Sequence, residues 1–458
     1  MSEPIPDYRS VLASVDRDGR RKWVEARIVW GRWRRWRMAL AVPLIAFYCT
    51  VPFMQVGGHP MLRLDILGGK FYVGGILFWP QDLSYFVILA LIGIVGTLLA
   101  VALLGRVFCG WFCPHDVFLE LVFRPLEHLL RGAPGQRKRS SLVRTALMWI
   151  GFITVSGGLA NAGTAIFTGA EAFDRYLFLD VVGHPYAAVF WAILFVIVLF
   201  NFGWFREQTC TIVCPYGRFQ TAMLDPHTLA VAYDQKRGEP RTHLKPEVAV
   251  ASPGDCVDCF LCVRVCPTAI DIRNGNQMEC IHCAACIDAC DSIMTKLHRP
   301  IGLIRYASEE QLAGRPRRVL RIRTVLYAIV LVALTGLLSW RLATRSDVLV
   351  SPLQQTAVPV AERDPDGRDC VRAVLPMALV NRRDREVMAR LVLDPALTAR
   401  VILPRPAELL PSNSRITLTP IIYIPRKEFI GRHLDVIIEV RDADDVVLGN
   451  TVISVRAP

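Results

Sequence analysis

Two cysteine-rich blocks stand in the chain: D-C-V-D-C-F-L-C-V-R-V-C-P at residues 255–267 and E-C-I-H-C-A-A-C-I-D-A-C-D at residues 279–291. Both have the spacing Cys-x2-Cys-x2-Cys-x3-Cys, which is typical of bacterial ferredoxins with two [4Fe-4S] clusters. In such modules three thiolates of one block bind one cluster, and the fourth cysteine binds the other cluster. The spacing therefore predicts an electron-transfer module.

This crossed pattern predicts four ligands for each cluster. The first cluster is expected on Cys256, Cys259, Cys262 and Cys290, and the second on Cys280, Cys283, Cys286 and Cys266. Zinc knuckles or a disulfide scaffold also use cysteines, but neither requires this spacing twice. Between the blocks, residues 270–278 are expected to form a strand–turn–strand with Asn274 and Gly275 at the turn.

The composition indicates a membrane protein. Hydrophobic residues make up 53% of the 458 residues, yet the net charge is +12. Long apolar runs joined by Arg-rich segments explain both values, because cytoplasmic loops of membrane proteins carry an excess of Lys and Arg. All of the 14 cysteines except Cys49 and Cys370 fall in four motifs. This usage favours a reducing compartment over a secreted disulfide scaffold.

Five segments are long and apolar enough to cross a bilayer, whose core needs about 20 apolar residues. They are expected at Met38–Val56, Leu83–Gly105, Leu142–Phe167, Pro185–Phe205 and Ile322–Leu342. The preceding residues end in W-G-R-W-R-R-W-R (residues 30–37), a run that would suit nucleic acid or heparin. Because an apolar helix follows at once, the run favours a membrane anchor, and we expect the lipid bilayer as a partner and no nucleic acid.

The distribution of Lys and Arg predicts the orientation. Residues 1–37, the loop 106–141 with its R-K-R run (residues 137–139), and residues 206–321 are rich in Arg. The loops 57–82 and 168–184 contain few basic residues. The positive-inside rule therefore places the N-terminus and the ferredoxin insert in the cytoplasm, and the C-terminus outside after five spans. No secretory signal is visible, so the first apolar segment is expected to be a true span.

These boundaries divide the chain into five expected parts. They are a basic cytoplasmic segment (1–37), four spans (38–205), a cytoplasmic segment (206–321) with the ferredoxin at about 251–299, a fifth span (322–342) and an outer domain (343–458). The outer domain contains β-branched, partly alternating runs that are separated by turn residues. This pattern predicts an immunoglobulin-like β-sandwich, in which Cys370 is expected to be a buried thiol and not a ligand.

Two cysteine pairs lie at the ends of spans: C-G-W-F-C-P at residues 109–114 and C-T-I-V-C-P at residues 210–215. Positions i and i+4 of a helix share a face, so Cys109 and Cys113, and likewise Cys210 and Cys214, are expected to point at one target. The proline that follows each pair is expected to end its helix. One soft thiolate pair suits Cu(I), and both pairs together suit a tetrathiolate site or a disulfide-cycling redox centre.

The alternative is that the pairs are apolar cysteines at span ends. Next to the first pair, His115 is an additional ligand, a proton donor or an interfacial histidine.

With these motifs, the chain resembles the cytochrome c oxidase accessory proteins of the FixG/CcoG/Rdx type, which are relatives of the membrane polyferredoxins. The resemblance is carried by F-W-P-Q-D (78–82), G-R-V-F-C-G-W-F-C-P (105–114), C-P-Y-G-R-F-Q (214–220) and both ferredoxin blocks. It implies a multi-pass protein of the bacterial cytoplasmic membrane, with a periplasmic C-terminal domain, that helps to assemble cbb3-type oxidase by reducing Cu(II) to Cu(I). The residues implied in copper handling are Cys109, Cys113, Cys210 and Cys214.

The implied activity is that of a cupric reductase, with copper chaperones or oxidase assembly factors as partners and a cytoplasmic reductant or a quinol as electron donor. Two alternatives belong to other classes. One is a quinol-linked electron conduit whose paired cysteines only support the fold, and the other is an assembly scaffold whose outer domain binds oxidase subunits. The sequence contains no Rossmann fingerprint and no flavin motif, so it does not indicate a nicotinamide or flavin donor site.

Overall fold

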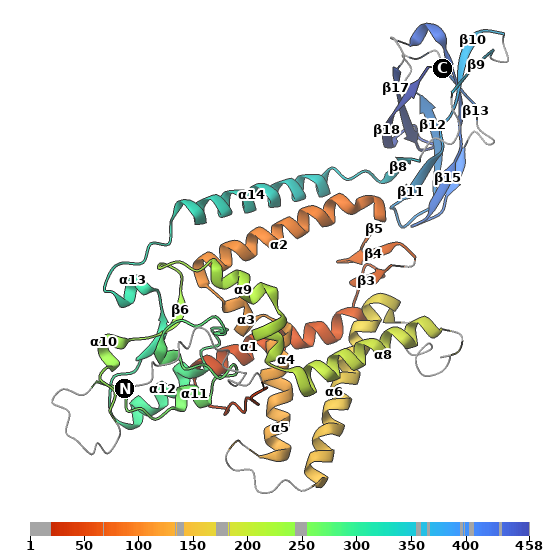
Figure 1. The fold of residues 1–458 in the computed structure, drawn as a ribbon. Helices are drawn as coiled ribbons and strands as arrows, with labels where there is room; N and C mark the ends of the chain where they lie inside the picture. The colour runs from red at the N-terminus through yellow and green to blue at the C-terminus, as the bar shows by residue number, and fades with distance from the viewer. Residues whose placement is uncertain are drawn as a thin grey trace. The chain divides into compact units, whose positions relative to one another are not determined.

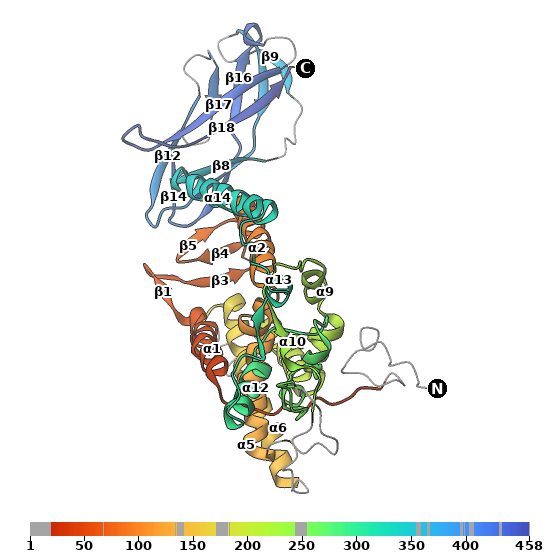
Figure 2. The same cartoon turned by 90° about the vertical axis from the view of Figure 1, so that its left-hand side faces the viewer.

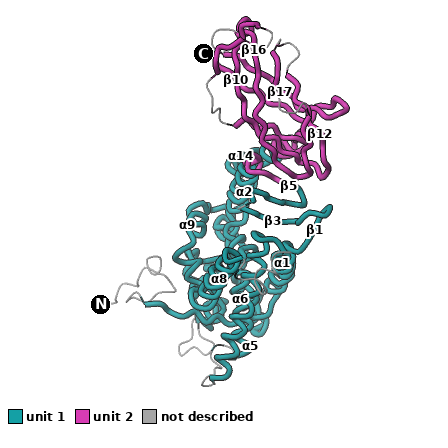
Figure 3. The backbone as a smooth tube through the Cα atoms, turned by 90° about the vertical axis from the view of Figure 1, so that its right-hand side faces the viewer, with its two compact units in different colours: residues 1–76, 86–335 teal, residues 77–85, 336–458 magenta. Residues whose placement is uncertain are grey.

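The computed structural model describes residues 20–66, 68–132, 134, 142–170, 182, 184–242, 254–353, 359–363, 367–393, 397, 399–402, 407–429 and 433–457. The chain divides into two compact units (Figure 3). The first comprises Met1–Ile76 and Phe86–Thr335, and the second comprises Leu77–Tyr85 and Gly336–Pro458. The predicted basic run at 137–139 and most of the loop 168–184 lie outside the described residues.

Five helices of the described chain are long and apolar enough to cross a membrane (Figure 1). They are α1 (Arg32–Thr50) with a 3-10 turn (Val51–Phe53), α2 (Leu83–Leu104), α6 (Leu142–Thr168), α8 (Pro185–Phe200) with a π-helical turn (Asn201–Phe205), and α14 (Ile322–Ala343). Four of them match the predicted segments closely. Helices α6 and α8 pack against each other, and an aromatic cluster lies beside them, in which Phe123 stacks on Phe202 at 4.6 Å between ring centroids.

Helix α1 differs from the prediction, because it begins at Arg32 and not at Met38. The carboxylate of Asp288 accepts hydrogen bonds from the backbone N–H groups of Trp33 (3.0 Å) and Arg34 (2.8 Å). These donors have no partner within the helix, so a carboxylate from the ferredoxin region stabilises the first turn. The basic run is therefore the start of the helix and not a separate segment before it.

The loop between α1 and α2 contains two small antiparallel sheets. The strands are β1 (Gln55–Val56) and β2 (His59–Pro60) in one, and β3 (Leu62–Asp65), β4 (Lys70–Val73) and β5 (Ile76–Phe78) in the other. A 3-10 turn (Pro80–Asp82) then leads into α2.

The helical segment before each proline of the paired-cysteine motifs ends ahead of it, as predicted, and each proline also begins a new helix. After the first pair, α4 starts at Pro114 (Pro114–Phe118), and after the second, α9 starts at Pro215 (Pro215–Ala222). Proline suits the first position of a helix, where its missing N–H would have no partner. The first pair connects α3 (Val107–Trp111) to α4, and α4 continues into a π-helical turn (Leu119–Phe123) and α5 (Arg124–Arg131).

As a result, neither pair lies on one face of a single α-helix, as had been expected. Cys113 and Cys214 have extended backbones at the caps of α4 and α9, and Cys210 lies in a π-helical turn (Thr209–Val213).

The ferredoxin region is built on the antiparallel strands β6 (Ala230–Tyr233) and β7 (Ile304–Ala307). Its helices are α10 (Gln235–Gly238), α11 (Leu261–Arg264), α12 (Ala285–Lys296) and α13 (Glu309–Leu312). The strand–turn–strand predicted at residues 270–278 is absent from this described stretch, which forms a 3-10 turn (Ile272–Asn274). The Asp271 side chain accepts the backbone N–H of Arg273 at 3.1 Å, and this local bond competes with strand pairing.

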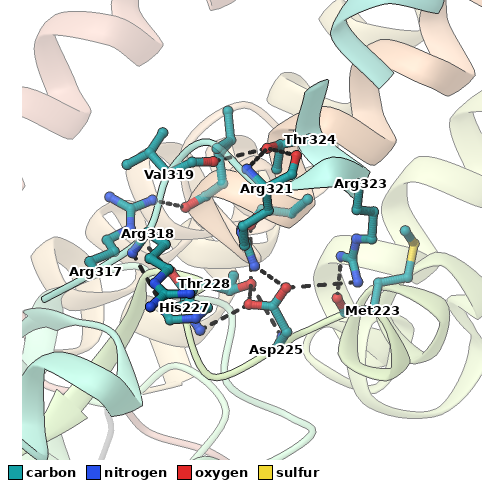
Figure 4. A network of polar contacts seen from close by, with 12 residues as sticks. Met223, Asp225, His227, Thr228, Arg317, Arg318, Val319, Arg321, Arg323 and Thr324 are labelled. Atoms are coloured by element: carbon teal, nitrogen blue, oxygen red, sulfur yellow. Dashed lines mark hydrogen bonds and ion pairs between the residues drawn. The ribbon is translucent and has the colours of Figure 1, made fainter. Parts of the chain in front are cut away.

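A network of arginines holds the start of α14 (Figure 4). Asp225 forms ion pairs with Arg321 and, at 3.8 Å, with Arg323. Arg321 also donates to the carbonyl of Ala102 at the end of α2 (2.7 Å), and Arg323 donates to the carbonyl of Met223 (2.7 Å). The basic residues that predicted the orientation therefore also cap the carbonyl ends of neighbouring helices.

The C-terminal part of the second unit contains eleven strands among its described residues, arranged in three antiparallel sheets. Figure 2 shows several of them. The strands are β8 (Val348–Pro352), β9 (Val360–Arg363), β10 (Asp369–Val374), β11 (Met377–Asn381), β12 (Val387–Leu393), β13 (Arg400–Ile402), β14 (Glu408–Leu410), β15 (Arg415–Leu418), β16 (Ile421–Pro425), β17 (His433–Arg441) and β18 (Val447–Arg456). The sheet orders are β15-β11-β8, β14-β12-β17-β18 and β13-β16-β10-β9. A 3-10 turn (Arg426–Glu428) separates β16 from β17.

The sheets share one apolar core, to which β17 contributes every second residue: Val436, Ile438 and Val440. Cys370 is buried on β10, as expected. The β-rich domain is confirmed, and its immunoglobulin-like topology stays a prediction.

Candidate iron–sulfur and paired-cysteine site

One small cavity of the ferredoxin region is lined by four cysteines: Cys256, Cys259, Cys262 and Cys290. The other walls of this cavity are mostly apolar. A second small cavity is lined by Cys266, Cys280, Cys283 and Cys286, and Cys262 also reaches its wall. Four cysteines around an apolar cavity fit a cubic iron–sulfur cluster. The residues present thus fit two clusters, and the assignment of each ligand stays a prediction.

The two cysteine loops have the same backbone conformation. In the first block, Asp258 and Phe260 have φ values of 48° and 56°, and at the equivalent places of the second block His282 and Ala284 have 55° and 63°. Non-glycine residues rarely adopt this left-handed region, and each costs about 1–2 kcal/mol. The repetition indicates that the fold imposes the conformation, which turns the chain tightly around each cavity.

Burial raises the pKa of three of these thiols, Cys262, Cys280 and Cys290, to about 12 each. A thiol with such a pKa stays protonated at neutral pH. Only a bound metal would make it a thiolate, and binding would release the proton. The buried environment therefore suits metal ligands and does not suit reactive free thiols.

A hydrogen bond connects the two paired-cysteine motifs. The Sγ of Cys109 donates to Oε1 of Gln220 at 3.0 Å, and Gln220 lies fully buried on α9, six residues after Cys214. The thiol of Cys210 is also close enough to the other three thiols to interact with them electrostatically. The structure thus brings both motifs together. Even so, no three Cys, His, Asp or Glu side chains in the described part of the chain are placed to hold a single metal ion.

Burial dominates the acidity of the paired cysteines. It raises the pKa of Cys109 to about 11, although the guanidinium of Arg106 acts in the opposite direction. It also raises the pKa of Cys113, against the backbone N–H groups of Asp116 and His115, and that of Cys210. These thiols are protonated at neutral pH until a cation displaces the proton.

His115 has a ring that packs against Phe202 at 5.3 Å between ring centroids. Burial lowers its pKa to about 4, so the ring is neutral at physiological pH. Neither ring nitrogen has a hydrogen-bond partner among the residues that the structure describes. A neutral imidazole with free nitrogens is chemically able to bind a metal. The role of His115 as a metal ligand stays a prediction.

The first paired-cysteine motif contacts the ferredoxin region directly. The charge distribution predicts that both lie on the cytoplasmic side, but it does not predict which residues meet. A Cβ added to Gly110 would lie 2.6 Å from the carbonyl oxygen of Ile281 and 2.8 Å from Cα of Cys283. The backbone N–H of Arg106 donates to Nδ1 of His282 at 3.0 Å, and the Trp111 indole donates to the carbonyl of His282 at 3.3 Å. His282 therefore contacts the segment around the first paired-cysteine motif through both its ring and its backbone. All of the cysteines are recognisable from the sequence, but the residues that make this long-range contact are not.

Buried ion pairs surround the paired cysteines and were also not predicted. Arg37 of α1 pairs with Asp116 at 2.8 Å and donates from Nε to the carbonyl of Gly110 at 2.8 Å. Arg124 pairs with Glu120 at 2.7 Å, and Arg206 pairs with Glu127 at 2.8 Å. Breaking a buried pair typically costs about 3–5 kcal/mol, because a charge is left without a partner. These pairs hold the helices around the site in one arrangement.

Fold and site together define an iron–sulfur electron-transfer protein with apolar helices. A model of a 4Fe-4S dicluster domain matches residues 205–309, and a model of a 4Fe-4S binding domain matches residues 86–135. The second match contains the first paired-cysteine motif.

The chain belongs to the FixG/Rdx family. It is 35% identical to protein RdxA of Cereibacter sphaeroides over 69% of this chain and 71% of that protein, and 32% identical to RdxB of the same organism over 71% and 73%. It is 37% identical to nitrogen fixation protein FixG of Rhizobium meliloti over 61% of this chain, but this match covers only 56% of FixG. The ferredoxin-type protein NapH of Haemophilus influenzae is a more distant relative, 26% identical over 58% of this chain and 91% of NapH. These relatives and the five apolar helices indicate a membrane protein.

Proposed function

We propose that this protein is a cupric reductase of the bacterial cytoplasmic membrane, which supplies Cu(I) for the assembly of cbb3-type cytochrome c oxidase. One observation supports it most: the first paired-cysteine motif contacts Cys283 of the second ferredoxin block through Gly110. An electron-transfer module would thus lie beside two pairs of soft ligands. When bound, the [4Fe-4S] clusters supply one-electron transfer between an external reductant and an acceptor.

Copper is the substrate in this proposal. Each Cu(II) ion accepts one electron and becomes Cu(I), so two ions require two electrons from a cytoplasmic reductant or a quinol. Cys109, Cys113, Cys210 and Cys214 are soft ligands that bind Cu(I) better than Cu(II), and this preference favours reduction. Gln220 holds Cys109 in place by its hydrogen bond. The half-buried thiols lose their protons when copper binds, so copper binding weakens at low pH.

The orientation and the outer domain belong to the same proposal. The ferredoxin region lies on the cytoplasmic side, because the Arg-rich segments flank it, and the C-terminal domain is periplasmic and immunoglobulin-like. In this arrangement the C-terminal domain meets copper chaperones or oxidase assembly factors outside, and the electron donor acts inside.

Serine variants of the paired cysteines test the copper role. The protein is reduced with dithionite, freed of excess reductant and mixed with Cu(II) and a Cu(I) chelator. Cys109→Ser and Cys214→Ser are expected to lose most Cu(II) reduction, because serine is a hard ligand. Their iron content should equal that of the wild type, since neither residue lines a cluster cavity. Cys49→Ser, a cysteine of α1 outside all motifs, is the matched control and should reduce Cu(II) normally. Normal reduction by both paired-cysteine variants would contradict the proposal.

A further inference from the structure

We propose that electrons leave the ferredoxin region through the second-block site, formed by Cys266, Cys280, Cys283 and Cys286, and that Gly110 and Arg106 form the junction to the paired cysteines. The first-block site then receives electrons from the external reductant. This inference rests on the proposed function for the identity of the acceptor, and it concerns the order of the two clusters.

The contacts of the second block support this order. Gly110 lies between Cys109 and Cys113, and its backbone contacts that of Cys283, with no side chain between them. All three atoms that an added Cβ would meet within 3 Å are backbone atoms of Ile281 and Cys283. Only glycine permits this approach, since backbone cannot move aside as a flexible side chain can. A direct backbone connection from the cluster ligand Cys283 to the first cysteine pair therefore passes through Gly110.

Arg106 joins the same two parts of the site. Arg106 is 2% exposed, and its backbone N–H donates to the ring of His282. Its guanidinium donates to the carbonyl of Met278 and approaches Gly217 of α9. The guanidinium also interacts with the thiol of Cys109. Arg106 is thus a buried cation that faces both a ferredoxin loop and the first paired cysteine.

The first block has different surroundings. Its cavity is lined by Phe260, which is 43% exposed, so this side of the ferredoxin region reaches the surface. The cation at this cavity, Arg273, pairs with both Asp258 and Asp271 at close range, and these carboxylates neutralise its charge. Within the described chain, by contrast, no carboxylate pairs with Arg106.

This difference in charge gives the transfer a direction. A cluster gains negative charge when it is reduced, and a nearby cation stabilises the reduced state, so hydrogen bonding and net charge set its potential. Arg106 therefore makes the potential of the second-block site more positive than that of the first. One electron passes from the first-block site to the second, and from there to Cu(II), which becomes Cu(I). A cytoplasmic one-electron reductant or a quinol replaces that electron.

Redox titration followed by EPR tests the order without any copper. Cys259→Ser and Cys286→Ser, which each perturb one block, assign the two signals. We expect Arg106→Gln to move the midpoint potential of the second-block signal to a more negative value and to leave the first unchanged. Arg106→Lys, which keeps the charge, should leave the midpoint potential of the second-block signal close to that of the wild type. A shift of the first-block signal, or of neither, would overturn the inference.

Gly110→Ala tests the junction itself, with Gly157→Ala as the matched control. Both glycines are helical, but a Cβ on Gly157 would meet no atom within 4 Å. When reduced protein is mixed with Cu(II), we expect Gly110→Ala to be oxidised several-fold more slowly and Gly157→Ala at the wild-type rate. Equal oxidation rates of the Gly110→Ala and Gly157→Ala proteins would contradict the proposal that Gly110 forms the junction. If wild-type protein is not oxidised by Cu(II), the proposed function fails, while the potentials of the Arg106 variants still decide the cluster order.

Discussion

Cys290 lies on α12 of the second block, but its side chain lines the cavity of the first block, together with Cys256 and Cys259. Cys290→Ser is therefore expected to remove the first-block cluster and to lower the iron content from about eight to about four per chain. The EPR signal that disappears should be the one lost in Cys259→Ser. Loss of the other signal, with the first-block signal intact, would show that the ligation is not crossed.

Asp82 forms a buried charge cluster within the second unit. Its carboxylate, 2% exposed, pairs with Arg345 at 3.1 Å and also with Arg382. Asp82→Asn is expected to destabilise this unit by about 3–5 kcal/mol, because two buried cations lose their partner. Thermal unfolding followed by circular dichroism measures the change.

Asp369→Asn is the control for Asp82. Asp369 pairs with Arg363 on the surface, where both side chains are 77% exposed, and such a pair contributes about 0–1 kcal/mol. Equal stability of the two variants would show that the Asp82 cluster does not stabilise the unit.

Single residues differ in how far the sequence predicts them. The cysteine ligands were identified because their spacing along the chain reflects the tight turns around a cluster. Gly110, Asp82 and Arg37 were not identified, because their partners are distant in the sequence and depend on how helices pack. The motif G-R-V-F-C-G-W-F-C-P contained Gly110, but nothing local shows that its neighbour is Cys283.

At the scale of elements, α14 depends on the clamp that Asp225 forms with Arg321 and Arg323 (Figure 4). Asp225→Asn is expected to loosen the chain before α14, so trypsin should cut residues 315–323 several-fold faster. Glu310→Gln, which removes the partner of the 68% exposed Arg315 side chain, is the control and should change little. Unchanged cleavage of Asp225→Asn would contradict the clamp.

The clamp also has a predictable dependence on pH. Burial acts to raise the pKa of Asp225, but the backbone N–H of His227 and the Arg321 guanidinium outweigh it, so the pKa lies below its ordinary value. A group whose pKa is lowered by folding contributes stability above its unfolded pKa and loses it as the pH falls through the folded pKa. The trypsin resistance should therefore be constant near neutral pH, and a non-enzymatic probe such as hydrogen exchange should detect the loss below about pH 4.

Elements with a strong periodic or apolar pattern were predicted well, and elements that depend on local hydrogen bonds were not. The apolar helices α2, α6, α8 and α14 follow from their apolar length alone. The start of α1 was missed because Asp288, far along the chain, caps it. The strands at residues 270–278 were predicted from Asn274 and Gly275, but Asp271 forms a local turn there instead.

At the scale of the whole molecule, the orientation is open to a direct test. A reporter that is active only outside the cytoplasm should work when fused after Pro458 and should be silent when inserted after Pro240. The reason is the excess of Arg around the ferredoxin region, which resists export. The reverse result would place the ferredoxin region outside.

The family and its cofactors could be predicted from the sequence, because the cysteine motifs carry both. The acceptor could not, because a thiol pair at a span end suits copper, a disulfide or simple packing. Two contacts bear on the choice between these roles of the thiol pairs. Cys109 forms a hydrogen bond with Gln220, and the backbone of Gly110 packs against that of Cys283. These contacts place the paired cysteines beside an electron source and favour a redox role.

The most direct test of this account is an electron count. Anaerobic protein is reduced fully with dithionite, freed of excess reductant and mixed with Cu(II) in the presence of a Cu(I) chelator. The account predicts about two Cu(I) per chain, because each cluster supplies one electron, and the loss of both EPR signals as the clusters are oxidised. Reduced signals that persist, with no Cu(I) formed, would contradict the claim that this protein passes electrons to copper.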